Sequence, residues 1–142
     1  MTVEELFNMI LENIERNGYA NYKEGYEFTA IIIDNYIDIM RLANESNEQL
    51  IGIISKDRKK VYFIKIIKYL SNMILEDING QGQVSYCNGY AILMAEHYHE
   101  IMITFEENGD KLFGKISTGI DKDNNVIIEQ VSFARNKEDL PN

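Results

Sequence analysis

The chain has 142 residues, of which 45% are hydrophobic and 26% are charged, and its formal net charge at pH 7 is −9. This length suits one domain with a continuous core, and this composition excludes an intrinsically disordered chain. A single cysteine, Cys87, excludes an internal disulfide framework.

The sequence has no basic and apolar leader of the secretory kind, and its longest apolar run is far too short to span a bilayer. We therefore expect a cytoplasmic protein with no membrane partner. Frequent Ile, Asn, Lys, Glu and Tyr, with one Pro and no Trp, fit an AT-rich bacterial or phage genome.

Residues 2–16 predict the first helix. Thr2 and Glu5 have the spacing of a capping box. Apolar residues then recur at helical spacing, at Leu6, Phe7, Ile10, Leu11 and Ile14. The pair Asn17-Gly18 predicts the end of this helix, because glycine reaches the left-handed conformation without steric cost.

The segment 27–42 fits two structures. A helix would place Phe28, Ile32, Tyr36 and Ile39 on one face, with Asp34 and Asp38 opposite. Its five isoleucines are better strand formers, and Asp34-Asn35 could form the turn of a hairpin. We favour the hairpin.

The middle of the chain predicts a second hairpin and a second helix. Strands at 50–55 and 61–65 flank a charged turn at 56–60. From Ile66 the apolar period changes to the helical one, which predicts a helix ending near Asp77, before Asn79-Gly80.

The C-terminal half predicts short antiparallel strands. Asn88-Gly89 separates strands at 84–87 and 90–96, residues 108–110 separate strands at 101–107 and 111–118, and residues 123–125 precede a strand at 126–134. The stretch 90–102 also suits a helix, because it is rich in Ala, Leu, Met and Glu; we favour strands. No internal repeat is evident beyond this hairpin rhythm.

The predicted fold class is therefore α+β, with one domain over residues 1–142. It has an N-terminal helix, strand hairpins, a second central helix and a C-terminal antiparallel β-meander, and residues 135–142 form a polar tail.

Motifs of catalysis or cofactor binding are not recognisable in the sequence. His97 and His99 would share one face of a strand and could approach a metal ion, but the spacing indicates no third ligand. Residues 121–125 resemble the start of a calcium loop, which then fails where Val126 and Ser132 replace the required glycine and glutamate. We predict no metal, no cofactor and no catalytic residue.

A basic turn contains Lys56, Arg58, Lys59 and Lys60, with Tyr62 and Phe63 beside it. Basic side chains interleaved with aromatic rings suit the binding of single-stranded nucleic acid. The acidic segments on both sides oppose such binding, so nucleic acid is not the partner we expect.

The leading functional hypothesis is a small acidic protein without enzymatic activity that binds and inhibits or regulates a partner macromolecule. Inhibitors, immunity proteins and phage anti-defence proteins, such as an anti-CRISPR, are of this type. The expected partner is a protein with a basic surface, and the expected contact residues are Glu12, Glu15, Tyr19, Tyr22 and Tyr26.

The alternative hypothesis is a pocket protein that sequesters or cleaves a small anionic, nucleotide-like ligand. Its ligand-binding residues would be Lys56, Arg58, Lys59, Lys60, His97 and His99. A homo-oligomer joined through exposed sheet edges is a third hypothesis.

Overall fold

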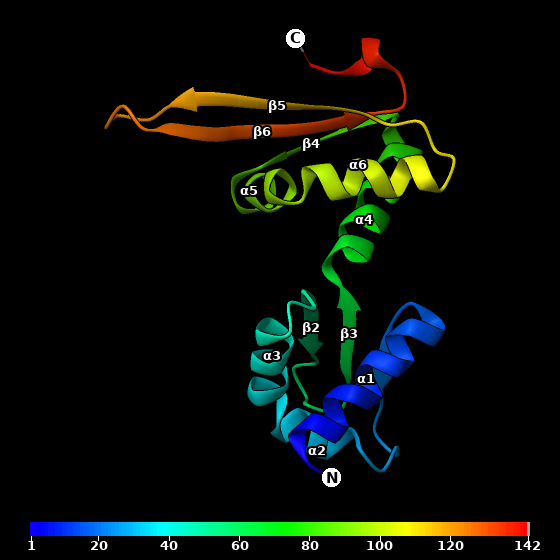
Figure 1. Ribbon diagram of the computed structural model, residues 1–142. Coiled ribbons are helices and arrows are strands. Elements are labelled where there is room, and N and C mark those ends of the chain that lie inside the picture. The colour runs from blue at the N-terminus through cyan, green and yellow to red at the C-terminus, as the bar shows by residue number, and fades with distance from the viewer. Residues whose placement is uncertain (142) are drawn as a thin grey trace. The chain divides into compact units, whose positions relative to one another are not determined.

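The computed structural model describes residues 1–141 and has a mixed α+β fold (Figure 1). The chain divides within one helix into two compact units, Met1–Tyr69 and the part from Leu70 onward. We call these the first unit and the second unit. Across the described residues, no helix combines the length and the apolar character that crossing a membrane requires.

The first unit consists of three helices and one three-stranded antiparallel sheet in the order β1-β3-β2. Its elements along the chain are α1 (Val3–Asn17), β1 (Ala20–Tyr22), α2 (Thr29–Asp34), α3 (Tyr36–Glu45), β2 (Leu50–Ile54) and β3 (Val61–Lys65). The predicted capping box is confirmed, because the Glu5 amide donates to the Thr2 hydroxyl at 3.1 Å and the Thr2 amide donates to the Glu5 carboxylate at 3.0 Å.

The core of the first unit is made by one face of each element. The α1 residues with helical spacing, Leu6, Ile10 and Ile14, are buried, as predicted. They are joined by Ile32, Ile39 and Phe63, from α2, α3 and β3.

The second unit contains helices and strands in the same order as the first. These are α4 (Ile66–Gln81), β4 (Gln83–Cys87), α5 (Asn88–Glu96), α6 (Tyr98–Glu107), β5 (Phe113–Ile120) and β6 (Val126–Ala134), followed by a short 3-10 turn at Lys137–Asp139. The first four residues of α4 belong to the first unit. The sheet is antiparallel in the order β4-β6-β5.

The second unit repeats the first in element order, sheet order and strand register. Ala20 and Gly52 flank Phe63 in one sheet, and Val84 and Gly114 flank Phe133 in the other. Identical residues occupy corresponding positions at Leu6 and Leu70, Ile10 and Ile74, Ile14 and Ile78, Gly18 and Gly82, Tyr22 and Tyr86, Tyr36 and Tyr98, Ile39 and Ile101, Gly52 and Gly114, and Phe63 and Phe133. The expectation of no internal repeat is wrong.

The hairpin predicted for 27–42 is also wrong, because this segment forms α2 and α3. Its isoleucines bury Ile32, Ile33 and Ile39 at helical spacing. β-branched residues lower helix propensity by only a few tenths of a kcal/mol each, whereas burying one such side chain contributes about 1.5–3 kcal/mol. Asn35 forms the joint between the two helices, and its side-chain amide donates to the Ile31 carbonyl oxygen at the end of α2.

In the C-terminal half, the strands predicted at 90–96 and 101–107 are wrong. These residues form α5 and α6, whose buried residues Ala91, Met94, Ile101 and Phe105 recur at helical spacing. Asn88-Gly89 begins α5 and makes no hairpin turn, although Asn88 has a positive φ of 57°. The strands predicted at 84–87, 111–118 and 126–134 and the helix from Ile66 are confirmed, with bounds shifted by a few residues.

Candidate functional site

The three predicted contact tyrosines line one hollow of the first unit. Its volume is about 560 Å³, and it is lined by Asn13, Asn17, Tyr19, Ala20, Asn21, Tyr22, Lys23 and Tyr26. We call it the tyrosine hollow. Tyr19 is 46% exposed and Tyr26 is 45% exposed, whereas Tyr22 is only 4% exposed. Two of the three rings are therefore accessible to a partner.

Stacking holds these rings in place. The Tyr19 ring stacks on Tyr62 of β3 with 5.9 Å between the centroids, and the Tyr26 ring stacks on Tyr22 with 5.7 Å. The Tyr22 hydroxyl accepts a hydrogen bond from the Asn13 side-chain amide at 2.6 Å, and burial raises the pKa of Tyr22. The exposed rings thus need little further ordering before they contact another molecule.

Comparison with the second unit separates scaffold from surface in this hollow. Tyr86, which corresponds to Tyr22, is also buried, and its hydroxyl donates to Asp77 at 2.7 Å, the residue that corresponds to Asn13. Tyr22 therefore belongs to the architecture that both units share. Tyr19 corresponds to Gln83, and the loop that carries Tyr26 has no counterpart because α5 begins directly after β4.

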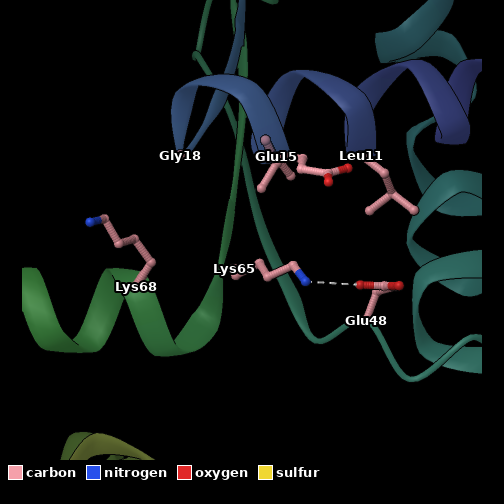
Figure 2. Close-up of a pocket in the computed structure, with 7 residues that line it drawn as sticks. Leu11, Glu15, Gly18, Glu48, Lys65 and Lys68 are labelled. Carbon is pink, nitrogen blue, oxygen red and sulfur yellow. Dashed lines mark ion pairs between the residues drawn. The ribbon is translucent and has the colours of Figure 1, made fainter. Parts of the chain in front are cut away.

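A second hollow lies beneath the C-terminal half of α1, between that helix, β3 and the start of α4 (Figure 2). Its volume is about 530 Å³, and it is lined by Leu11, Ile14, Glu15, Gly18, Glu48, Lys65 and Lys68. We call it the lysine hollow. Lys65 forms an ion pair with Glu48, with 3.2 Å between Nζ and Oε2. Within residues 1–141, neither Glu15 nor Lys68 has an ion pair or a side-chain hydrogen bond.

The predicted acidic residues occupy different positions from the tyrosines. Glu12 is exposed on α1, and Glu15 lines the lysine hollow. The tyrosine hollow uses Asn13 and Asn17 from the opposite side of α1. The structure therefore brings the three tyrosines together and places Glu15 in a separate site of the same unit.

The basic turn connects β2 and β3, and its residues 56–60 are exposed. The Ser55 hydroxyl donates to Asp57 at 2.6 Å and accepts from the Lys59 and Lys60 amides, so this turn is well ordered. The Asp57 carboxylate accepts from the Ser55 hydroxyl and from the Lys59 amide, and these two hydrogen bonds keep its pKa below the usual value. Lys59 lies 3.6 Å from Glu24 in an exposed ion pair, and Lys56, Arg58 and Lys60 also point to solvent.

His97 and His99 belong to the second unit, whereas the basic turn belongs to the first. His97 forms the joint between α5 and α6, its side chain is 11% exposed, and its Nδ1 lies 3.8 Å from Glu100. His99 is exposed on α6, where residues two apart do not share a face. In the described part of the chain, no three His, Cys, Asp or Glu side chains are grouped so that they could hold a metal ion.

Sequence reasoning missed the lysine hollow as a site. Lys65 and Lys68 lie just after the basic turn in sequence, and Glu48 lies in a polar loop, so neither the lysines nor the acid gives a local signal. Only the pairing of β2 with β3 and the packing of α1 bring Glu15, Glu48 and Lys65 together.

Comparisons with protein-family models, with curated proteins and with solved structures found no match to the chain. The two units of the repeat can instead be compared with each other, position by position. Positions that the two units share identify the scaffold. Positions that differ, above all Tyr19, Tyr26 and Glu15, identify the candidate functional surface.

Proposed function

We propose that this chain is a binding protein without enzymatic activity that inhibits or regulates a partner protein with a basic surface. The contact surface would lie on the first unit. The observation that carries the proposal is the tyrosine hollow, where two accessible tyrosine rings stand beside three asparagines.

This combination of side chains is typical of surfaces that recognise proteins. Tyrosine supplies a large, rigid and amphipathic contact area at a low cost in conformational entropy, and asparagine supplies adaptable hydrogen bonds. Tyrosine is also enriched at the centres of protein interfaces. Tyr19 and Tyr26 have the exposure and the stacked support that such anchors need.

Charge favours a basic partner over nucleic acid. Nucleic acid has to be considered because two successive helices with a tight joint have the plan of a helix-turn-helix, whose second helix enters the major groove in DNA-binding proteins. In Figure 1, α5 is seen end-on and α6 side-on, so the chain turns sharply between them. The second helix of each pair carries exposed acidic side chains, which repel phosphate groups and attract basic side chains of a protein. These are Asp38 and Glu45 in α3, and Glu100, Glu106 and Glu107 in α6.

Affinity capture tests this proposal. The tagged chain is used as bait in a bacterial lysate and compared with the double variant Tyr19→Ala/Tyr26→Ala. The matched control is Tyr90→Ala, because Tyr90 is 51% exposed and lies in the second unit. We expect the wild type and the control to retain one protein in stoichiometric amount and the double variant to lose it. Equal capture by all three chains, or no stoichiometric partner, would contradict the proposal.

A further inference from the structure

The two units differ at the lysine hollow in one informative way. In the second unit, the residue that corresponds to Lys65 is Arg135. Lys65 is the last residue of β3, and Arg135 directly follows the last residue of β6. The Arg135 guanidinium lies 3.9 Å from Asp110 and donates to Asn79 at 3.1 Å. Asp110 and Asn79 correspond to Glu48 and Glu15.

One guanidinium in the second unit therefore bridges two positions that stay apart in the first unit. Lys65 reaches Glu48 but has a compact ammonium instead of the broad, planar fork of arginine. Glu15, a full carboxylate where the second unit has an amide, is left without an ion pair within residues 1–141. Figure 2 shows the Glu15 side chain over the hollow, with Lys65 directed toward Glu48.

We infer that the lysine hollow receives an arginine side chain of the partner protein, with its guanidinium against the Glu15 carboxylate. The inference rests on the proposed function, since it names the group of a basic partner that the first unit recognises. The second unit already holds an arginine side chain, that of Arg135, at the corresponding place. A carboxylate in place of the amide gives a charge-assisted hydrogen bond, which is about twice as strong as a neutral one.

The rest of the hollow fits the remainder of an arginine side chain. Leu11 and Ile14 provide apolar surface for its methylene groups. Gly18 also lines the hollow, and it has open space where a side chain would begin. Lys68 also lines the hollow, and its positive charge opposes the guanidinium. Removing that charge should therefore strengthen binding.

The test adds N-acetyl-arginine amide as the probe to the whole chain. Binding is monitored by NMR, through the chemical shifts of the methyl groups of Leu11 and Ile14. The comparison probe is N-acetyl-citrulline amide, which has the same shape without the charge. We expect saturable methyl shifts with the arginine probe, with a dissociation constant on the order of millimolar for so small a contact. Citrulline should bind at least tenfold more weakly, and Lys68→Gln should bind the arginine probe more tightly.

Two variants locate the guanidinium. Glu15→Gln should weaken the arginine probe about tenfold, while Glu106→Gln, an equal charge change on exposed α6, should leave it unchanged. Lys65→Arg keeps the net charge and should fill the hollow from within, as Arg135 does, and block the probe. Thermal unfolding of each variant confirms that it is folded.

Equal shifts with arginine and citrulline, no shifts, or undiminished binding to Lys65→Arg would overturn the inference. Free L-arginine binding tenfold more tightly than the blocked probe would overturn it as well, because the hollow would then recognise a small amino acid. A failure of the proposed function looks different, because the probe would bind as expected while the bait retained no partner protein.

Discussion

Tyr36 in α3 donates a hydrogen bond from its hydroxyl to the carbonyl oxygen of Gly52 in β2, at 2.9 Å. A Cβ atom at position 52 would lie only 2.6 Å from that hydroxyl oxygen, so the ring can cover the strand only because the residue is glycine. Tyr98 covers Gly114 in the same way in the second unit. This contact fixes the second helix of each pair on its hairpin.

The first prediction concerns this contact. Gly52→Ala should lower the free energy of unfolding by about 1–3 kcal/mol, because the added methyl group displaces the Tyr36 ring. Chemical denaturation measures the change. The control is Gly80→Ala, in a helix and with open space around its Cβ, which should raise stability by about 0.5–1 kcal/mol. A stable Gly52→Ala chain would show that the strand does not need this glycine.

The second prediction concerns alkaline stability. Burial, reinforced by the nearby Asp77 carboxylate, raises the pKa of Tyr86 well above its ordinary value of about 10. Above pH of about 10 the unfolded chain loses the Tyr86 proton while the folded chain keeps it. Stability is therefore retained below that pH and falls as pH rises toward the raised pKa. Denaturation at a series of pH values should show a shallower alkaline decline for Tyr86→Phe than for the wild type.

The third prediction concerns Ser71, which corresponds to Phe7 of the first unit. Its hydroxyl is buried in α4 without a hydrogen-bond partner among the described residues. Burying an unsatisfied hydroxyl costs about 1–3 kcal/mol. Ser71→Ala should therefore leave the melting temperature unchanged or raise it, whereas a clear loss of stability would mean that the hydroxyl has a partner.

Much of the fold could be predicted where local sequence and tertiary packing agree. The Thr2 capping box, the apolar stripe of α1 and the hairpin around residues 56–60 are of this kind. Prediction failed for 27–42 and 90–102, where isoleucines and Asn88-Gly89 favoured strands. There the burial of one helical face against the sheet outweighed weak local preferences.

The repeat is difficult to recognise in the sequence because its spacing changes along the chain. Gly18 and Gly82 are 64 positions apart, Gly52 and Gly114 are 62 apart, and Phe63 and Phe133 are 70 apart. The longer β5–β6 hairpin and the missing loop before α5 cause these shifts. One fixed period therefore aligns only part of the chain, such as the stretch from Leu6 and Leu70 to Tyr22 and Tyr86, and the strand register aligns the rest.

The candidate site was half predictable for a related reason. Exposed tyrosines and acids can be recognised in sequence, so Tyr19, Tyr26 and Glu15 were expected contacts. That Tyr22 is scaffold became clear only from its buried hydroxyl and its counterpart Tyr86. Glu48 and Lys65 acquire meaning only from the ion pair that the fold creates.

The most direct test of the central claim measures the association rate with the captured partner at low ionic strength. Glu12→Lys/Glu15→Lys is compared with Glu106→Lys/Glu107→Lys, which changes the net charge equally but on the second unit. Because complementary charge mainly accelerates association, the first double variant should associate about tenfold more slowly, and the difference should shrink in high salt. Equal rates for the two double variants would contradict a binding surface on the first unit.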